Sequence, residues 1–321
     1  MTGKLEMPRF AILIATRNRP QKMVQLLTSL CELSYQPTQV VIVSSGSPIH
    51  EEILDFQKKL NIKYSHLDQG GQIRQKIEGL KLVPRSVDWI LFLDDDVLLN
   101  KNSVSNAFRY LEREGNTKTI VGIGFKNGDT VDKSSSLFKS IVSQFFGIIN
   151  TNRGSVTKNG QSVDYMDSLE TIETKWLNGI SMWRRDIALE YNIPFLEAPY
   201  SSCEDLIFSY SASKKGRLLF IPDCEFTFQE DSLVLKQSFS VFKSTTYWRL
   251  YFVLSNKEFN VRKFLWSQVG RTISYCLVSG GRELPLAKRI WKSIGIFIDL
   301  TYLIASKTPA IKVLQLRQSG I

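Results

Sequence analysis

Four short apolar runs alternate with amphipathic segments in the first ninety residues, and this alternation constrains the fold more than any other feature. Short apolar runs predict buried strands, whereas apolar residues at helical spacing predict helices. The predicted strands are residues 10–15, 39–43, 63–67 and 89–93, and the predicted helices begin near residues 20, 51 and 73. Such alternation predicts an α/β fold with a doubly wound, mostly parallel sheet, in which ligands bind beyond the carboxyl ends of the strands.

Three consecutive carboxylates follow the fourth predicted strand. Asp94, Asp95 and Asp96 repel one another unless a cation or hydrogen-bond donors neutralise them. Mg²⁺ and Mn²⁺ prefer carboxylate oxygen and share their other positions with water and substrate phosphates, so two acids two residues apart suffice. The alternative is a solvated turn before the helix predicted from Ser103. The position at a strand's carboxyl end favours the ligand-binding interpretation.

A second acidic pair, Glu204 and Asp205, directly precedes an apolar helical run. The pair is therefore predicted in the first turn of a helix. One interpretation is a favourable interaction with the helix dipole. The other is a general base within hydrogen-bond reach of an acceptor hydroxyl.

The net charge of +10 is concentrated at the C-terminal end of the sequence. Residues 232–321 contain 14 Lys and Arg against 3 acids, which leaves residues 1–231 near −1. This asymmetry predicts a near-neutral domain over residues 1–231 and a basic, aromatic-rich helical region over residues 232–321.

In the basic region, aromatic and aliphatic residues are interleaved with Lys and Arg. Helices with cationic flanks and aromatic residues on their apolar face bind the interface of anionic bilayers. No segment reaches about 20 uninterrupted apolar residues, so peripheral attachment is expected rather than a span. The alternative is a helical subdomain that packs on the body with a solvated basic face. Nucleic-acid binding is not expected, because no recognised nucleic-acid motif is present.

The four cysteines are widely spaced and form no CxxC pair, which argues against a zinc site or a disulfide framework. The N-terminus does not have the pattern of a secretory signal. Both features predict a reducing, intracellular setting.

Four segments resemble, in their order and spacing, the motifs of family 2 glycosyltransferases. They are FAILIATRNRP at 10–20, FLDDDV at 92–97, WLNGISMWRR at 176–185 and CEDLIFSY at 203–210. The resemblance covers about residues 8–230 and implies a GT-A fold and an inverting mechanism. It also implies a nucleoside-diphosphate sugar donor, Mn²⁺ or Mg²⁺ as cofactor, and a hydroxyl acceptor.

Combined with the basic region, the resemblance implies a bacterial surface-polysaccharide enzyme. Its acceptor would be a glycan or a lipid-linked sugar at the cytoplasmic face of the cell membrane. The alternative from another functional class is a non-catalytic protein that binds nucleotide sugars or glycans on the same scaffold.

The resemblance also implies roles for individual residues on the donor side. Thr16, Arg17 and Asn18 would line the nucleoside pocket, and Arg74 would approach the donor as a planar, bidentate phosphate ligand. Arg74 is alternatively a solvated residue on a helix face. At the position where the family commonly has an aspartate that contacts the nucleobase, this sequence has Ser44, so the identity of the base stays open.

On the catalytic side, Asp94 and Asp96 would be the metal ligands of a DxD element, and Asp95 would lie near the ribose. Asp205 would take the proton of the acceptor, assisted by Glu204. Attack on the anomeric carbon then proceeds in one displacement without an enzyme nucleophile.

Two further features complete the expected site. Trp176 and Gly179 would form a wall near the sugar and the acceptor, although Trp176 is alternatively an ordinary core residue. Many family members have a metal-binding histidine after the acidic pair, which this sequence lacks. Gln229, Glu230 and Asp231 are the candidates to replace it.

Overall fold

The computed structural model describes residues 8–115, 117–129, 143–148, 152–194, 201–229, 238–277 and 284–318. The chain divides into two compact units. The first, named the α/β unit, comprises Met1–Asp132, Tyr165–Ile193 and Phe208–Ser232. The second, named the helical unit, comprises Lys133–Asp164, Pro194–Ile207 and Leu233–Ile321.

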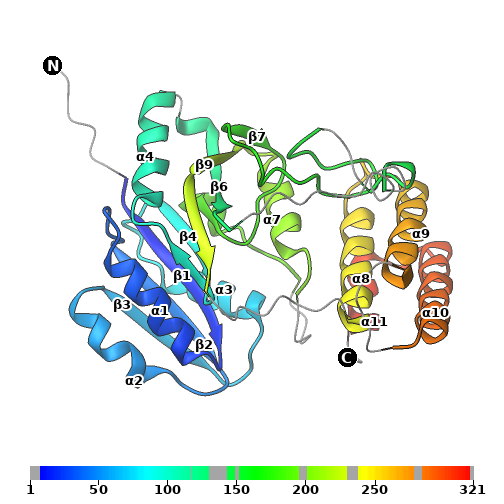
Figure 1. The fold of residues 1–321 in the computed structure, drawn as a ribbon, viewed down its shortest axis with the longest axis horizontal. Coiled ribbons are helices and arrows are strands. Elements are labelled where there is room, and N and C mark those ends of the chain that lie inside the picture. The colour runs from blue at the N-terminus through cyan, green and yellow to red at the C-terminus, as the bar shows by residue number, and fades with distance from the viewer. Residues whose placement is uncertain are drawn as a thin grey trace. The chain divides into compact units, whose positions relative to one another are not determined.

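A nine-stranded sheet forms the centre of the α/β unit (Figure 1). The strands β3, β2, β1 and β4 are adjacent in that order and all parallel. Their bounds are Phe10–Arg17 for β1, Gln39–Ser45 for β2, Ile62–Leu67 for β3 and Trp89–Asp94 for β4. The four strands predicted from the apolar runs are thus confirmed, and their carboxyl ends share one edge of the sheet.

The rest of the sheet is mixed in direction. The additional strands are β5 (Val97–Leu99), β6 (Ile120–Asn127), β7 (Ile172–Thr174), β8 (Ser181–Arg184) and β9 (Arg217–Phe228). Strand β8 is antiparallel to both β4 and β6, while β6 and β9 are parallel. Strands β5 and β7 pair antiparallel with β9. The predicted α/β class is confirmed.

Helices connect the strands as the alternation predicts. They are α1 (Pro20–Cys31), α2 (His50–Ile53), α3 (Gln72–Leu82), α4 (Ser103–Glu114), α6 (Arg185–Ala188) and α7 (Glu204–Ala212). The helix predicted near residues 51–59 is divided, because the 3₁₀ turn η1 (Leu54–Lys58) follows α2. Helix α4 begins at Ser103 as predicted, and α7 begins with the acidic pair.

The side chains of β1 alternate between two buried faces of the sheet, as the period of a strand requires. Phe10, Ile12 and Ile14 join one core cluster with apolar residues of α1 and α4. Leu13 points to the other face, which α3 covers. A Cβ at Gly79 of α3 would lie 2.2 Å from the Leu13 side chain, so the glycine allows α3 to approach the sheet closely.

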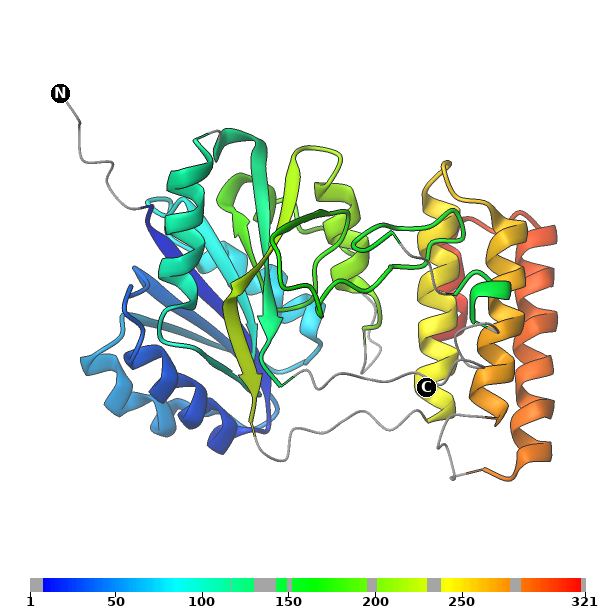
Figure 2. The same cartoon turned by 45° about the horizontal axis from the view of Figure 1, so that its top comes forward.

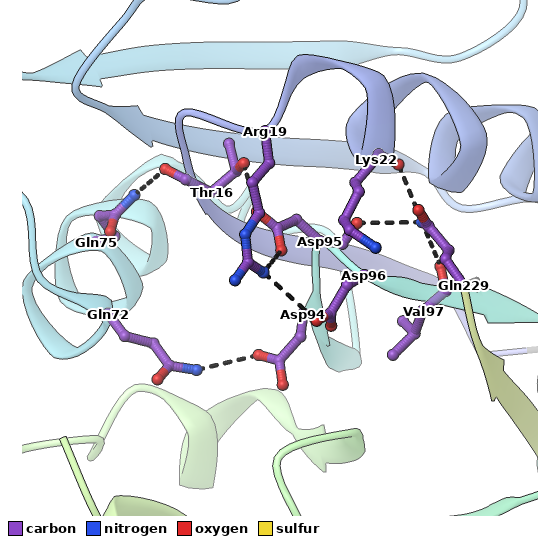
Figure 3. Close-up of polar contacts among 10 residues, drawn as sticks. All are labelled: Thr16, Arg19, Lys22, Gln72, Gln75, Asp94, Asp95, Asp96, Val97 and Gln229. Atoms are coloured by element: carbon purple, nitrogen blue, oxygen red, sulfur yellow. Dashed lines mark hydrogen bonds and ion pairs between the residues drawn. The ribbon is translucent and has the colours of Figure 1, made fainter. Parts of the chain in front are cut away.

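Helix α3 is also joined to two strand ends by a buried amide. The Nε2 atom of Gln75 donates to the carbonyl oxygens of Thr16 and Val43, both at 2.7 Å (Figure 3). The two carbonyls belong to neighbouring parallel strands, β1 and β2. One side chain therefore fixes the relative position of the loops that follow these strands.

The helical unit contains α8 (Phe239–Ser255), α9 (Val261–Leu277), α10 (Leu286–Ala305) and α11 (Ala310–Gln318). Helix α8 packs against α9, α10 and α11, and α9 also packs against α10 (Figures 1 and 2). The predicted helical C-terminal region is confirmed. Among the residues that the structure describes, no helix has both the length and the apolar character that a membrane span requires.

Replacement of Gln75 by leucine should destabilise the α/β unit. The variant leaves two carbonyl oxygens without their donor, at a cost of about 2 kcal/mol in the free energy of unfolding. A urea titration of Gln75→Leu measures this cost. The matched control is Gln25→Leu, on an exposed position of α1, which should change the same free energy by less than about 0.5 kcal/mol. Equal effects of the two variants would contradict the assigned role of Gln75.

Candidate active site

The acidic triplet lies at the carboxyl edge of the parallel strands. Asp94 ends β4 and is level with Ala15 of β1, while Asp95 and Asp96 form the turn that leads into β5. This is the edge at which α/β sheets bind their ligands. Figure 3 shows the three carboxylates with side chains from the loop after β1 and from α3 around them.

Asp95 is the most enclosed carboxylate of the triplet, with 5% of the residue exposed. Its Oδ2 accepts a hydrogen bond of 2.6 Å from the Thr16 hydroxyl. Its Oδ1 accepts one of 2.8 Å from Nη1 of Arg19. The same nitrogen lies 3.4 Å from Oδ2 of Asp96. A hydroxyl at the end of β1 and a guanidinium from the segment after it thus stabilise the centre of the triplet, and only the guanidinium offsets its charge.

Asp94 is held from the opposite side. Its Oδ1 accepts a hydrogen bond of 3.0 Å from Nε2 of Gln72, the first residue of α3. Its Oδ2 lies beside Gly179, where an added Cβ would be 3.5 Å away. Within the described residues, Oδ2 accepts no hydrogen bond. This oxygen is available to a ligand that binds against the glycine.

Asp96 has a perturbed acidity. Burial raises the pKa of Asp96, and the nearby charges of Asp94 and Asp95 raise it further. The positive charges of Arg19 and Lys22 oppose this shift without cancelling it. Ionised Asp96 is therefore under-compensated, and an added cation would stabilise its charged form.

Gln229 follows β9 and supports the backbone of the triplet. Its Nε2 donates to the carbonyl oxygens of Lys22, Asp95 and Val97, at 3.0, 3.2 and 3.3 Å (Figure 3). Its Oε1 is buried and has no hydrogen-bond partner in the described part of the chain. The side chain thus holds the turn, and the other two predicted substitutes for a histidine, Glu230 and Asp231, lie outside the described residues.

The predicted nucleoside-pocket residues lie on adjacent loops at the same edge. Asn18 has a positive φ of 55°, and its Oδ1 accepts a hydrogen bond of 2.7 Å from the backbone N–H of Ser47. Arg17 is exposed at the end of β1. The hydroxyl of Ser44 is within hydrogen-bond distance of Tyr64 (2.7 Å) and His66 (2.8 Å).

Two other predicted residues are already engaged by the protein. Nη1 of Arg74 donates to Oε1 of Gln69 at 2.6 Å. Trp176 is 9% exposed, and its ring packs against Tyr165 with centroids 4.9 Å apart. Interior packing thus accounts for most of the indole surface, and its role as a wall of the sugar site stays a prediction.

The predicted base belongs to the other unit. The division between the units falls within α7, after Ile207, so Glu204 and Asp205 are part of the helical unit. They occupy the first turn of α7, as predicted. The acidic triplet belongs to the α/β unit, so the role of Asp205 as a base for the donor bound there stays a prediction.

Several residues that organise the site were not identified from the sequence. Arg19, Gln72 and Gln75 make the hydrogen bonds described above. Arg19 carried a weak signal, since it stands two residues after Arg17. Gln72 and Gln75 carried none, because their partners lie far away in the sequence. Gln229 was expected as a substitute for a metal-binding histidine, whereas in the structure it donates to backbone carbonyls.

The donor set of the triplet fits a hard divalent cation. Asp94 and Asp96 offer carboxylate oxygens, which Mg²⁺ and Mn²⁺ prefer, and these ions retain several waters or phosphate oxygens. In the described residues, no three His, Cys, Asp or Glu side chains converge on one metal position. The protein would thus supply two ligands and leave the remaining positions to a substrate.

Replacement of Asp96 by asparagine should raise the thermal stability of the protein without added metal or nucleotide. At pH 7 the variant removes a charge whose ionisation costs stability, so Tm should rise by about 2 °C. The gain in Tm should shrink as the pH falls towards 4. Asp96 of the parent is then protonated first in the folded state and finally in the unfolded state as well, so that its charge no longer costs stability. Scanning calorimetry at several pH values measures this. The control is Asp55→Asn, which changes an exposed side chain and should show no gain in Tm. A lower Tm for Asp96→Asn than for the parent at pH 7 would contradict the prediction.

Comparison with known proteins gives the family. A model of the family described as "Glycosyl transferase family 2" matches residues 11–177. The poly(ribitol-phosphate) beta-N-acetylglucosaminyltransferase TarS of Staphylococcus aureus is 23% identical over 132 residues, which are 40% of this chain and 23% of that enzyme. The match thus spans less than a quarter of the curated relative.

Solved structures share the fold. S. aureus TarS 1–349 in complex with UDP-GlcNAc has a TM-score of 0.60 at 18% identity, over 91% of this chain and 81% of that one. The mannosyltransferase PcManGT from Pyrobaculum calidifontis, in complex with GDP-Man and Mn²⁺, has a TM-score of 0.52 at 14% identity, over 97% of this chain and 88% of that one. GalNAc-T7 with UDP, GalNAc and Mn²⁺ has a TM-score of 0.54 at 14% identity, over 96% of this chain and 59% of that one. The predicted GT-A fold is confirmed. Because the family model matches more than half of the 321 residues, this chain belongs to glycosyltransferase family 2 and is a glycosyltransferase.

Proposed function

We propose that the enzyme transfers a sugar, with inversion, from a nucleoside diphosphate to a hydroxyl of a glycan or lipid-linked acceptor. The observation that carries the proposal is the acidic triplet at the carboxyl edge of the sheet, in a chain of this family. The structurally similar proteins named above were solved with UDP-GlcNAc, GDP-Man or UDP. The name of TarS describes transfer of N-acetylglucosamine to poly(ribitol phosphate), which supports a role in polysaccharide biosynthesis.

Asp94 and Asp96 are proposed to hold Mn²⁺ or Mg²⁺ against the donor diphosphate. When bound, the ion supplies a Lewis acid that offsets the charge of the departing nucleotide. Two of the similar structures contain Mn²⁺. Asp95, which is proposed to lie near the ribose, already accepts hydrogen bonds from Thr16 and Arg19, so the centre of the triplet is pre-organised before the donor binds.

Side chains from the ends of β1 and β2, from α3 and from residues 176–179 are proposed to bind the nucleoside and the sugar. Thr16, Arg17, Asn18 and Ser44 lie at the ends of β1 and β2, which are neighbours in the sheet. Arg74 approaches the phosphates from α3, where its planar fork binds two oxygens. Trp176 and Gly179 border the sugar, and Gly179 already lies beside Asp94.

Asp205 is proposed as the general base, with Glu204 beside it. Its carboxylate takes the acceptor proton while the acceptor oxygen attacks the anomeric carbon, and the nucleotide leaves in the same displacement. Both acids occupy the first turn of α7, where the helix dipole favours negatively charged side chains.

Helix α10 supports the proposed attachment to the inner face of an anionic membrane. One face packs inside the helical unit through Ile296, Leu300 and Leu303. The opposite face exposes apolar side chains at intervals of about four residues, namely Leu286, Ile290, Trp291, Ile294, Ile298 and Tyr302. Lys288 and Lys292 flank this stripe and are exposed. Such a surface suits the interface of a bilayer with anionic lipids, to which each Lys contributes about 1 kcal/mol.

The substitution Asp205→Asn tests the catalytic base. We expect kcat to fall by about 10²- to 10⁴-fold, while the affinity for the donor changes little, because the amide cannot accept the acceptor proton. Steady-state kinetics and donor binding are measured on the same preparations. Asp223→Asn, at an exposed position of β9, is the control. Transfer by Asp205→Asn at the parental rate would show that the base is assigned wrongly.

Removal of either proposed metal ligand should weaken the effect of Mn²⁺ on nucleotide affinity. For Asp94→Asn and Asp96→Asn, we expect the Mn²⁺-dependent affinity for nucleoside diphosphates to fall by more than about tenfold. A thermal-shift panel of UDP, GDP, CDP and dTDP, with and without Mn²⁺, measures this and identifies the base. Asp55→Asn should behave as the parent. Unchanged Mn²⁺ dependence in both ligand variants is the outcome that contradicts the metal site.

The double substitution Trp291→Ser with Ile298→Ser tests membrane attachment. The parent should float with vesicles that contain phosphatidylglycerol and not with vesicles of phosphatidylcholine alone, and the double variant should remain in the soluble fraction. The control is Leu54→Ser, at an exposed apolar position of the α/β unit. If the parent does not float with anionic vesicles, the alternative of a helical subdomain without membrane contact gains support.

A further inference from the structure

Two arginines of the helical unit share one neutral acceptor. Arg249 of α8 is 3% exposed, and its Nη1 donates to Oε1 of Gln161. Nη1 of Arg271, from α9, lies 3.2 Å from the same oxygen. Two positive charges therefore converge on one amide oxygen, which carries no compensating charge.

The donors of Arg249 are incompletely used. Its Nε and Nη2 are buried and have no hydrogen-bond partner, and neither arginine forms an ion pair, among the residues that the structure describes. Burial lowers the pKa of Arg249 to about 9, and the charge of Arg271 acts in the same direction. Burial also lowers the pKa of Arg271. A buried cation without an anionic partner is costly, so an anion that the described residues do not supply would stabilise the arginine pair.

The arginine pair lies beside the residues that precede α7, the helix whose first turn contains the proposed base. Burial raises the pKa of the Cys203 thiol to about 11, although both arginines are close enough to lower it. The hydroxyls of Ser202 and Thr245 are 3.4 Å apart. Thr245 lies one helical turn before Arg249 on α8, on the same face of the helix. Cys203 immediately precedes Glu204, so the arginine pair and the acidic pair are neighbours within the helical unit.

We propose that Arg249 and Arg271 bind a phosphoryl group of the acceptor, with Gln161 as the residue that orients both guanidinium groups. A phosphoryl group offers several oxygens and up to two negative charges, which match the free donors and the charge of two guanidinium forks. The assignment to the acceptor rests on the proposed function, because Asp205 would lie next to the accepting hydroxyl. The acceptor is then a phosphate ester whose hydroxyl lies close to its phosphoryl group.

Binding of small phosphates to the full chain tests the site. The probes are inorganic phosphate and glycerol 3-phosphate, titrated by calorimetry at constant ionic strength with chloride. We expect saturable binding by the parent and a loss of at least about tenfold in affinity for Arg249→Gln and Arg271→Gln. Arg262→Gln removes the same charge from an exposed position of α9 and should bind like the parent. Absence of saturable binding by the parent, or an equal loss in Arg262→Gln, overturns the site.

Thermal stability separates a binding role from a structural one. Without phosphate, Arg249→Gln should have the same Tm as the parent or a higher one, because it removes a buried charge that has no partner. A structural role predicts a lower Tm. If Arg249→Gln fails to fold, Arg271→Lys decides. A folded Arg271→Lys that loses at least about tenfold in affinity for glycerol 3-phosphate supports the site, and any other result overturns it.

Nucleotide binding in the same variants distinguishes this proposal from the proposed function. We expect both arginine variants to bind nucleoside diphosphate with Mn²⁺ as the parent does, and to lose glycerol 3-phosphate binding alone. A parallel loss of nucleotide binding would assign the phosphoryl group to the donor and overturn the acceptor assignment. A parent that binds nucleotide with Mn²⁺ but neither small phosphate refutes the subsite and leaves the proposed function intact. A parent that binds glycerol 3-phosphate but no nucleotide refutes the proposed function and supports the anion site.

Discussion

Mutual repulsion of three adjacent carboxylates is the constraint around which the site of this enzyme is built. Parallel strands bring the loop after β1 and the start of α3 to the edge where β4 ends. There, Thr16 donates a hydrogen bond to Asp95, Arg19 offsets the charge of Asp95, and Gln72 donates to Asp94. Gln75 and Gln229 add no charge but fix the backbone on either side. What remains is a carboxylate edge that is only partly compensated, which suits the proposed binding of a cation together with the substrate.

The features that could be predicted from the sequence are those that local patterns determine. Apolar runs predicted the four parallel strands, and Asp94 was correctly expected at the carboxyl end of the fourth, which is where the candidate site lies. The acidic pair was correctly expected at a helix start. The strand β5 was missed because three residues are too few to show a period, and η1 replaced part of a predicted helix because a single turn carries no distinctive pattern.

The residues that escaped prediction act through contacts that are distant in sequence. Gln75 bonds a carbonyl 59 positions away. Gln229 was expected as a metal-site substitute, but its bond to a carbonyl 134 positions away was not. A buried glutamine that satisfies backbone carbonyls looks, in sequence, like any polar residue. In the basic region, likewise, only the total charge could be read from the sequence. In the structure, exposed lysines lie beside the apolar stripe of α10, whereas Arg249 and Arg271 converge in the interior of the helical unit. The lysines suit an anionic lipid surface, and the arginines suit a single phosphoryl group.

Anomalous diffraction at the manganese edge, from crystals grown with Mn²⁺ and the nucleoside diphosphate that binds best, tests the central claim most directly. The account predicts one strong anomalous peak within about 2.5 Å of carboxylate oxygens of both Asp94 and Asp96, in contact with the diphosphate. A manganese peak remote from these carboxylates, or a diphosphate bound away from them without metal, would contradict it.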